Sequence, residues 1–139
     1  MKILGFNRVE LIVREDQIDA AVEKFNRLLG THLPEPFVVP GQTVKSATDF
    51  DGFVEFVSGV NGEGPFAARV AEKGAGQIGP LVWEVDDIDS AREWANEKGL
   101  AIAYEYESEE GIRQIIFDRD EWFGFTVTFM QRPRPQLPL

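Results

Sequence analysis

The sequence contains no cysteine and only one histidine, His32. The lack of cysteine excludes disulfide bonds, thiolate metal sites and a cysteine nucleophile. One histidine leaves little basis for Ser-His-Asp catalysis or for a metal site built from several imidazoles. Because His32 falls in a connecting segment, we expect it to be exposed and inert.

Long apolar runs are also missing. No stretch of the sequence approaches the ~20 apolar residues that a membrane-spanning helix needs. Residues 1–6 lack the extended apolar core and the cleavage site of a secretory signal. We therefore expect a cytoplasmic protein with no membrane partner.

Positive charge is scarce as well. The sequence has 14 Lys and Arg residues against 24 Asp and Glu residues, which gives a net charge of −10. Nucleic-acid binding requires a basic stripe, so nucleic acid is not an expected partner. The acidic excess favours cationic small ligands only weakly, because solubility alone accounts for such a charge.

Large apolar side chains are abundant in the sequence. It has 11 Phe and 3 Trp among 139 residues, and 43% of the residues are hydrophobic. Each buried aromatic side chain removes ~150–250 Å² from water. The length and composition predict a single globular domain with a substantial core.

Two segments about half a chain apart share one pattern. The apolar run Val9–Val13 precedes an amphipathic segment over residues 18–30, and Leu81–Val85 precedes a similar segment over residues 88–99. Each predicts a strand followed by a helix that ends at a glycine. The repeat indicates an internal duplication, and the junction of duplicated modules is a favoured place for a ligand cavity.

The remaining pattern predicts an α+β fold in which each strand–helix pair is followed by three strands. The expected strands are 8–13, a short strand at most within 31–40, 42–50, 53–58, 81–85, 101–106, 112–118 and 123–130, and the expected helices are 18–29, 65–73 and 88–98. One domain would then contain module one (about 3–60), a bridging helix (65–73), module two (about 78–131) and a proline-rich tail (132–139). The tail is expected to extend along the surface or along a partner subunit.

Local signals support these boundaries. Glu15 or Asp16 is expected to cap the first helix, and Asp86 or Asp87 the helix of the second module. The dipeptide at 51–52, Asp-Gly, predicts a hairpin turn.

Strand residues alternate between the two faces of a sheet. If Val9, Leu11 and Val13 pack on the first helix, the residues between them point away from it. The groups expected to share a face are Arg8, Glu10 and Ile12; Phe53, Glu55 and Val57; Pro80, Val82 and Glu84; and Thr126 and Thr128. Trp83 alternates with Glu84 and is expected in the core beneath the second helix.

Three stretches resemble the vicinal oxygen chelate superfamily, which includes glyoxalase I, bleomycin-resistance proteins, extradiol dioxygenases and methylmalonyl-CoA epimerase. They are residues 8–29, 78–89 (IGPLVWEVDDID) and 117–131 (FDRDEWFGFTVTFMQ), and they look most like the epimerase branch. The resemblance implies two tandem βαβββ modules that form a curved mixed sheet around a central cavity. It also implies a homodimer.

The metal-dependent members of this superfamily draw four ligands from strands, usually two histidines with Glu or Gln. The resemblance places Arg8, Pro80 and Thr128 at three of those positions and retains only Glu55. Arginine has no acceptor atom and stays protonated. Beside a dication at ~4 Å it would cost roughly 8 kcal/mol at an effective dielectric near 20. We therefore expect no metal and no cofactor, with a relocated Mg²⁺ or Mn²⁺ site at Glu10, Glu55 and Glu84 as a weaker alternative.

The candidate catalytic residues are Arg8 and Glu55. An arginine could anchor a carboxylate or enolate, and a buried glutamate could act as a general base. The alternative is an internal ion pair that only fills the former metal position. The candidate ligand-binding residues are Glu10, Phe53, Val82, Glu84, Trp122, Phe123 and Thr128. For Glu10 and Glu84 the alternative is a solvated position at a rim, and for Trp122 and Phe123 it is a lid or a dimer contact.

The expected function is a metal-independent protein that binds or converts a small organic molecule in the cavity between the modules. An isomerase or lyase using Arg8 and Glu55 is the enzymatic form of this hypothesis. The alternative is a protein of the bleomycin-resistance type that sequesters a drug. A divalent-metal epimerase or lyase with relocated ligands is the weaker alternative.

Overall fold

The computed structural model describes residues 1–133 of the chain. Its residues fall into two compact units, one formed by residues 8–79 and the other by residues 1–7 together with residues from 80 onward. The part of the predicted tail over residues 134–139 lies outside the described residues.

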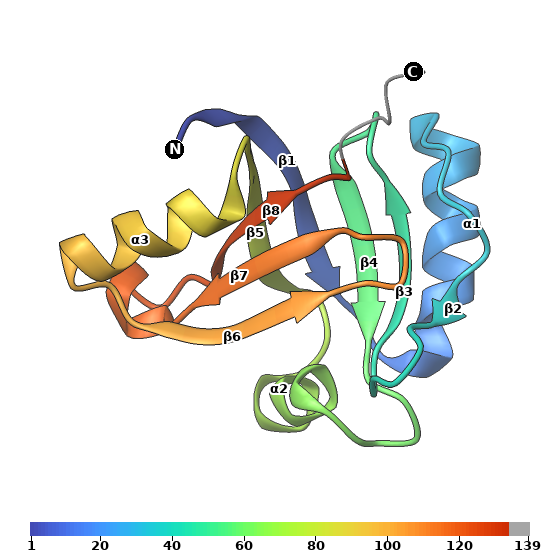
Figure 1. Cartoon of the computed structure of the whole chain (residues 1–139). Coiled ribbons are helices and arrows are strands. Elements are labelled where there is room, and N and C mark those ends of the chain that lie inside the picture. Colours follow the sequence, from blue (N-terminus) through green and yellow to red (C-terminus); the bar gives the residue numbers. More distant parts are fainter. Residues whose placement is uncertain (134–139) are drawn as a thin grey trace, which may run out of the picture. The chain divides into compact units, whose positions relative to one another are not determined.

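The first unit contains one four-stranded arrangement with its helices (Figure 1). The strands lie in the order β2-β3-β4-β1, with β1 and β4 parallel and the other neighbours antiparallel. The elements are β1 (Ile3–Ile12, of which the first unit holds the part from Arg8), a 3-10 turn (Glu15–Gln17), α1 (Ile18–Leu29), β2 (Phe37–Val38), β3 (Lys45–Asp49), β4 (Val54–Ser58) and α2 (Pro65–Lys73).

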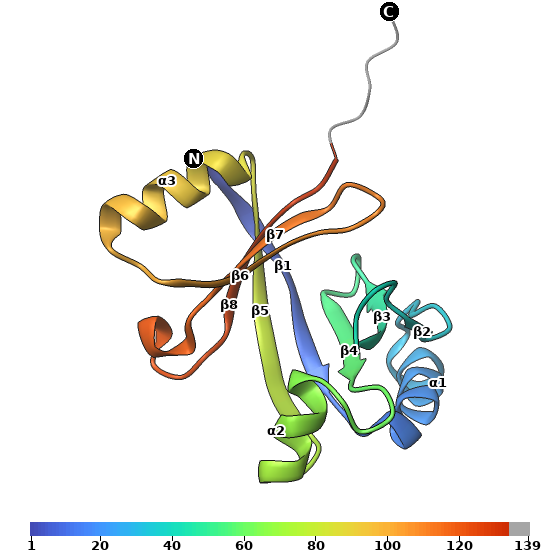
Figure 2. The same cartoon turned by 60° about the horizontal axis from the view of Figure 1, so that its bottom comes forward.

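Helix α1 covers one face of these strands. Figures 1 and 2 both show it alongside β3 and β4. Ile18 and Val22 of α1 are buried with Phe56 of β4, and Phe25 meets the Phe56 ring edge-on with centroids 4.7 Å apart. The helix ends at Gly30 with φ of 70°, the left-handed stop that the sequence predicts.

The start of α1 corrects one prediction. Glu15 and Asp16 lie inside the 3-10 turn, and the residue that precedes the helix is Gln17, whose side chain makes no capping bond to α1. The Gln17 side chain instead accepts a bond from the backbone N–H of Arg14. The expected carboxylate cap is therefore wrong, because the extra turn moves both carboxylates away from the helix end.

The β3–β4 hairpin is held by the side chain of Asp49. Its carboxylate accepts bonds from the backbone N–H groups of Asp51, Gly52 and, from the connecting segment, His32. These bonds lower the pKa of Asp49, the one from His32 most. The predicted hairpin and the exposed position of His32 are both confirmed.

The second unit repeats the plan. Its strands lie in the order β5-β8-β7-β6, with β5 and β8 parallel. The elements are β5 (Gln77–Val85, of which this unit holds the part from Pro80), α3 (Ile88–Lys98), β6 (Ile102–Glu107), β7 (Arg113–Phe117), a 3-10 turn (Arg119–Trp122) and β8 (Val127–Gln131).

Helix α3 begins and ends as the sequence predicts. Asp87 caps it by accepting bonds from the N–H groups of Asp89 and Ser90, and Gly99 ends it with φ of 70°. Beneath the helix, Ile88 packs with Phe117 and Phe129 in a buried cluster, and Trp83 lies against this cluster. The predicted core position of Trp83 is confirmed.

Both units therefore show a strand, a helix and three further strands, which confirms the α+β fold with tandem βαβββ modules. Strands β1 and β5 begin at Ile3 and Gln77, earlier than predicted. Strand β8 begins at Val127 rather than at 123, because Phe123 adopts a left-handed conformation after the 3-10 turn. Within residues 1–133, no helix is long and apolar enough to cross a membrane.

Candidate functional site

The first unit buries a cluster of charged side chains on β1 and β4, which we call the Arg8 cluster (Arg8, Glu10 and Glu55). Arg8 is 4% exposed, and Glu10 and Glu55 are each 7% exposed. The Nε atom of Arg8 donates to Oε1 of Glu55 at 2.7 Å, and its Nη2 atom donates to Oε2 of Glu10 at 3.3 Å. The ion pair between Arg8 and Glu55, which the sequence left as the alternative to a catalytic role, is present.

Strand geometry explains why these residues meet. The parallel pairing of β1 and β4 sets Glu10 opposite Glu55, and alternation puts Arg8 on the same face as Glu10. Leu11 and Phe56, the next residues along the two strands, pack on the α1 side instead. The prediction that Arg8 and Glu10 point away from α1 is confirmed.

Close backbone contact accompanies the cluster on β1. A Cβ atom added to Gly79 would lie 2.9 Å from the carbonyl oxygen of Glu10 and 3.1 Å from a side-chain carbon of Ile12. Gly76 also donates its N–H to the carbonyl of Ile12 at 2.9 Å. The segment with these two glycines can therefore approach β1 only because position 79 has no side chain.

Two residues of the first unit complete the cluster, and neither was singled out from the sequence. Thr48 of β3 donates its hydroxyl to Oε1 of Glu55 at 2.7 Å, and the ring of Phe50 lies 5.6 Å from the guanidinium carbon of Arg8. A signal for Thr48 was present. A hairpin turning at residues 51–52 pairs residue 48 with residue 55, which is the observed register.

The cluster contains one guanidinium and two carboxylates. Burial raises the pKa of Glu10 to about 8, with a further contribution from the charge of Glu55, while the charge of Arg8 opposes the shift. Burial by itself would lower the pKa of Arg8, but the charges of Glu55 and Glu10 outweigh it and raise that pKa. At neutral pH, Arg8 is thus charged and Glu10 is mainly the neutral acid.

A divalent cation fits these side chains poorly. Both carboxylates already contact Arg8, and a cation beside them would face the fixed positive charge of the guanidinium. Within residues 1–133, no group of three or more His, Asp or Glu side chains is placed to hold a metal ion.

In the second unit, Val82 and Thr128 lie opposite each other on β5 and β8 and both are buried. The hydroxyl oxygen of Thr128 has no hydrogen-bond partner within the described part of the chain. A buried hydroxyl without a partner costs roughly 1–3 kcal/mol. Thr128 is therefore suited to a ligand atom that would accept or donate this bond.

Two further candidate ligand residues of the second unit, Glu84 and Trp122, have different partners. Glu84 is half-buried and forms an ion pair with Arg132 at 3.1 Å. Trp122 packs edge-on against Phe117, on the α3 side of its strands, and its indole N–H has no partner among residues 1–133.

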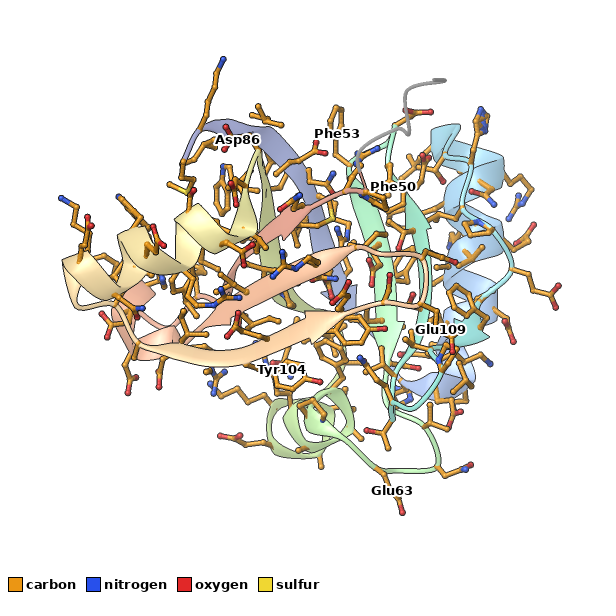
Figure 3. All side chains as sticks on the ribbon, in the orientation of Figure 1. Phe50, Phe53, Glu63, Asp86, Tyr104 and Glu109 are labelled. Atoms are coloured by element: carbon orange, nitrogen blue, oxygen red, sulfur yellow. The ribbon has the colours of Figure 1, made fainter. Side chains whose placement is uncertain are left out.

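Phe53 and Phe123 lie outside regular strands, which corrects their assigned positions. Phe53 closes the β3–β4 turn with φ of 59° and is 55% exposed, so it does not continue the face of Glu55 (Figure 3). Phe123 is 95% exposed with φ of 60°. Of the seven candidate ligand residues, the structure thus brings only Glu10 to the Arg8–Glu55 pair within the first unit.

The family model described as the Glyoxalase/Bleomycin resistance protein/Dioxygenase superfamily matches residues 7–117. This match spans most of the chain and extends through β7 of the second module, and the protein belongs to that superfamily. None of the curated proteins compared with the sequence matches it.

Solved structures with low sequence identity show the same fold. Methylmalonyl-CoA epimerase from Mycobacterium tuberculosis is 17% identical, with a TM-score of 0.83 over 95% of this chain and 90% of that one. A variant of the Streptomyces coelicolor epimerase in complex with 2-nitronate-propionyl-CoA is 15% identical, with a TM-score of 0.81 over 96% and 100%. A hypothetical protein from Bacillus halodurans is 17% identical, with a TM-score of 0.81 over 96% and 97%.

Proposed function

We propose that this protein binds a small organic oxyanion, a carboxylate or an enolate, at the Arg8 cluster without a metal ion. The buried guanidinium of Arg8 between two carboxylates carries the proposal. Guanidinium groups recognise carboxylates through charge-assisted bonds, and these bonds are strong where water is excluded. The epimerase folds and the superfamily membership support a small-molecule ligand.

The same cluster supports isomerase or lyase chemistry. Both bonds to Glu55 are made by its Oε1 atom, from Arg8 and Thr48, and no bond to Oε2 occurs within residues 1–133. Oε2 is therefore the oxygen that could accept a proton from a carbon next to a carbonyl group. Arg8 would stabilise the negative charge that this step creates on the ligand.

A thermal-shift screen tests the ligand class. Small carboxylates and acyl thioesters, methylmalonyl-CoA among them, should raise the melting temperature of the parent protein and not of Arg8→Lys. Stabilisation by bleomycin instead would favour drug sequestration, for which the net charge of −10 is the supporting observation. Bound divalent metal at one per chain, removed by a chelator with loss of stability, would contradict metal independence.

Thr128→Val tests the buried hydroxyl of the second unit by itself. Valine has nearly the shape of threonine and removes a buried hydroxyl that has no partner among residues 1–133, so stability should hold or rise. The predicted homodimer is checked in the same preparations by light scattering after gel filtration.

A further inference from the structure

The two carboxylates of the Arg8 cluster are held very differently. Glu55 receives a bond from Arg8 at 2.7 Å and another from Thr48 at 2.7 Å, both at Oε1. Glu10 receives one longer bond, at 3.3 Å from the Nη2 atom of Arg8. Charge-assisted bonds of this kind are usually about 2.7–2.9 Å long, so the contact of Glu10 is the weak one.

The balance of charge also indicates that Glu55 is held more firmly than Glu10. One guanidinium can balance one of the two carboxylates, and the better bonded Glu55 is the natural partner of Arg8. Glu10 then lies beside Glu55, since the two occupy paired positions on neighbouring strands. Glu10 is therefore the member of the pair whose negative charge, when it is ionised, is least well compensated.

We infer that Glu10 is an internal competitor for the ligand: it holds the Nη2 side of Arg8 until an incoming carboxylate or enolate takes its place. Glu55 and Thr48 are positioning residues that keep the guanidinium oriented during this exchange. This inference rests on the proposed function, because it assumes that the ligand is an oxyanion bound by Arg8.

The exchange leaves the charge of the site unchanged only if Glu10 starts as a carboxylate and takes up a proton from solvent as the oxyanion arrives. The arriving oxyanion replaces the Glu10 oxygen at Nη2, and Glu10 leaves as the neutral acid or is repelled as a carboxylate. Apart from that protonation, no covalent bond forms or breaks. A cationic ligand could not take the place of Glu10 at Nη2, because the guanidinium of Arg8 would repel it.

Isothermal titration of malonate into purified Glu10→Gln and into the parent protein tests the inference. Both titrations are made above the raised pKa of Glu10, about 8, so that Glu10 is a carboxylate. Glutamine then removes the competing charge and leaves the pair of Arg8 with Glu55 in place, so the variant should fold. We expect malonate to bind Glu10→Gln on the order of tenfold more tightly, the worth of about one charge-assisted hydrogen bond. Glu10→Asp, which keeps the charge but withdraws it by one methylene group, should fall between the two.

The matched control is Glu105→Gln. Glu105 is also a carboxylate bonded to an arginine, Arg92, but its side chain is 44% exposed on β6. Under the same conditions, above the raised pKa of Glu10, its loss changes the net charge as Glu10→Gln does and should leave malonate affinity unchanged. If Glu105→Gln raises the affinity equally, the effect is one of overall charge and the inference is wrong.

The remaining outcomes separate the inference from the proposed function. Malonate that binds the parent and Glu10→Gln equally, or binds the variant more weakly, overturns the inference and leaves the proposed function standing, provided that Arg8→Lys abolishes binding. Malonate that binds none of the proteins overturns the oxyanion ligand and the inference together.

Discussion

The two units pair their strands in the same register, but the paired residues differ in chemical character. In the first, β1 and β4 place Glu10 opposite Glu55, and in the second, β5 and β8 place Val82 opposite Thr128. These are corresponding positions of the duplicated modules. One pair is charged and bonded to an arginine, and the other is a buried valine beside a threonine whose hydroxyl has no partner within the described residues.

The faces turned to the helices are alike. Phe56 and Phe129, the next residues along β4 and β8, are each 3% exposed and each meets an aromatic residue of the neighbouring helix. The comparison teaches that packing against a helix constrains one face of each module. The opposite face can carry different chemistry on the same backbone.

Removing the central charge of the first unit has the largest expected effect. Arg8→Met leaves Glu10 and Glu55 buried without the counter-charge that Arg8 provides. Breaking a buried ion pair in this way costs about 3–5 kcal/mol. Urea denaturation at neutral pH should show a lower midpoint with little change in slope.

A triple variant sharpens that result by giving the first unit the apolar character of the second. Arg8→Met combined with Glu10→Val and Glu55→Thr removes all three charges, and such replacements are often neutral or stabilising. The free energy of unfolding should return close to the parent value. A triple variant as unstable as Arg8→Met alone would show that the two units differ in the packing of this strand face and not only in its charge.

The next largest expected effect is the dependence of stability on pH. The pKa of Glu10 is about 8 in the folded chain against an ordinary value of 4.5. Between these values the folded chain holds a proton that the unfolded chain has released, so the free energy of unfolding falls as pH rises. The slope is about 1.4 kcal/mol per pH unit at most. This contribution is fully present below the ordinary pKa and is lost once pH exceeds the raised one.

Urea titrations at a series of pH values measure this slope. Glu10→Gln should flatten it, because glutamine does not titrate, and Glu105→Gln on exposed β6 should leave it unchanged. An unchanged slope in Glu10→Gln would mean that another group of the chain takes up the proton.

The helix caps give a smaller contrast. Asp87 accepts two backbone bonds at the start of α3, so Asp87→Ala should destabilise the chain by about 1 kcal/mol. Gln17 makes no bond to the backbone of α1, and Gln17→Ala should therefore have a smaller effect. Thermal unfolding of the two variants side by side provides the measurement, and equal losses would contradict the difference in capping.

The smallest expected effect concerns the charges of the second unit. There Asp89 bonds Arg92 and Arg113 on the exposed surface, and the hydrogen bonds from Arg113 and then Arg92 lower its pKa to about 2. Solvent and salt screen such contacts. Asp89→Asn should change stability little, and the change should shrink further in high salt. A loss comparable to that of Arg8→Met would remove the contrast between buried and exposed clusters.

Local sequence patterns predicted much of this arrangement. Alternation assigned Arg8 and Glu10 to one face, and the hairpin signal at residues 51–52 implied the register of Thr48 with Glu55. The early start of β1 could not be predicted from its neighbours. The chain there is held by distant residues, as where Lys2 bonds the backbone and side chain of Asp86.

The positions of Phe53 and Phe123 were missed for a different reason. Both adopt positive φ, which bulky residues seldom do, so composition gives no warning of it. Their side chains left the expected faces because the turn backbone, rather than strand alternation, sets their direction.

The size of the residue at position 79 can affect the pKa of Glu10 although glycine carries no charge. Any side chain there would press on the carbonyl of Glu10 and push that stretch of β1 aside, altering how far its carboxyl group lies from Arg8. A single methyl group, added on a segment distant in sequence, could thus change the proton affinity of the cluster. Gly79→Ala is therefore expected to change the pKa of Glu10 as well as the stability of the chain.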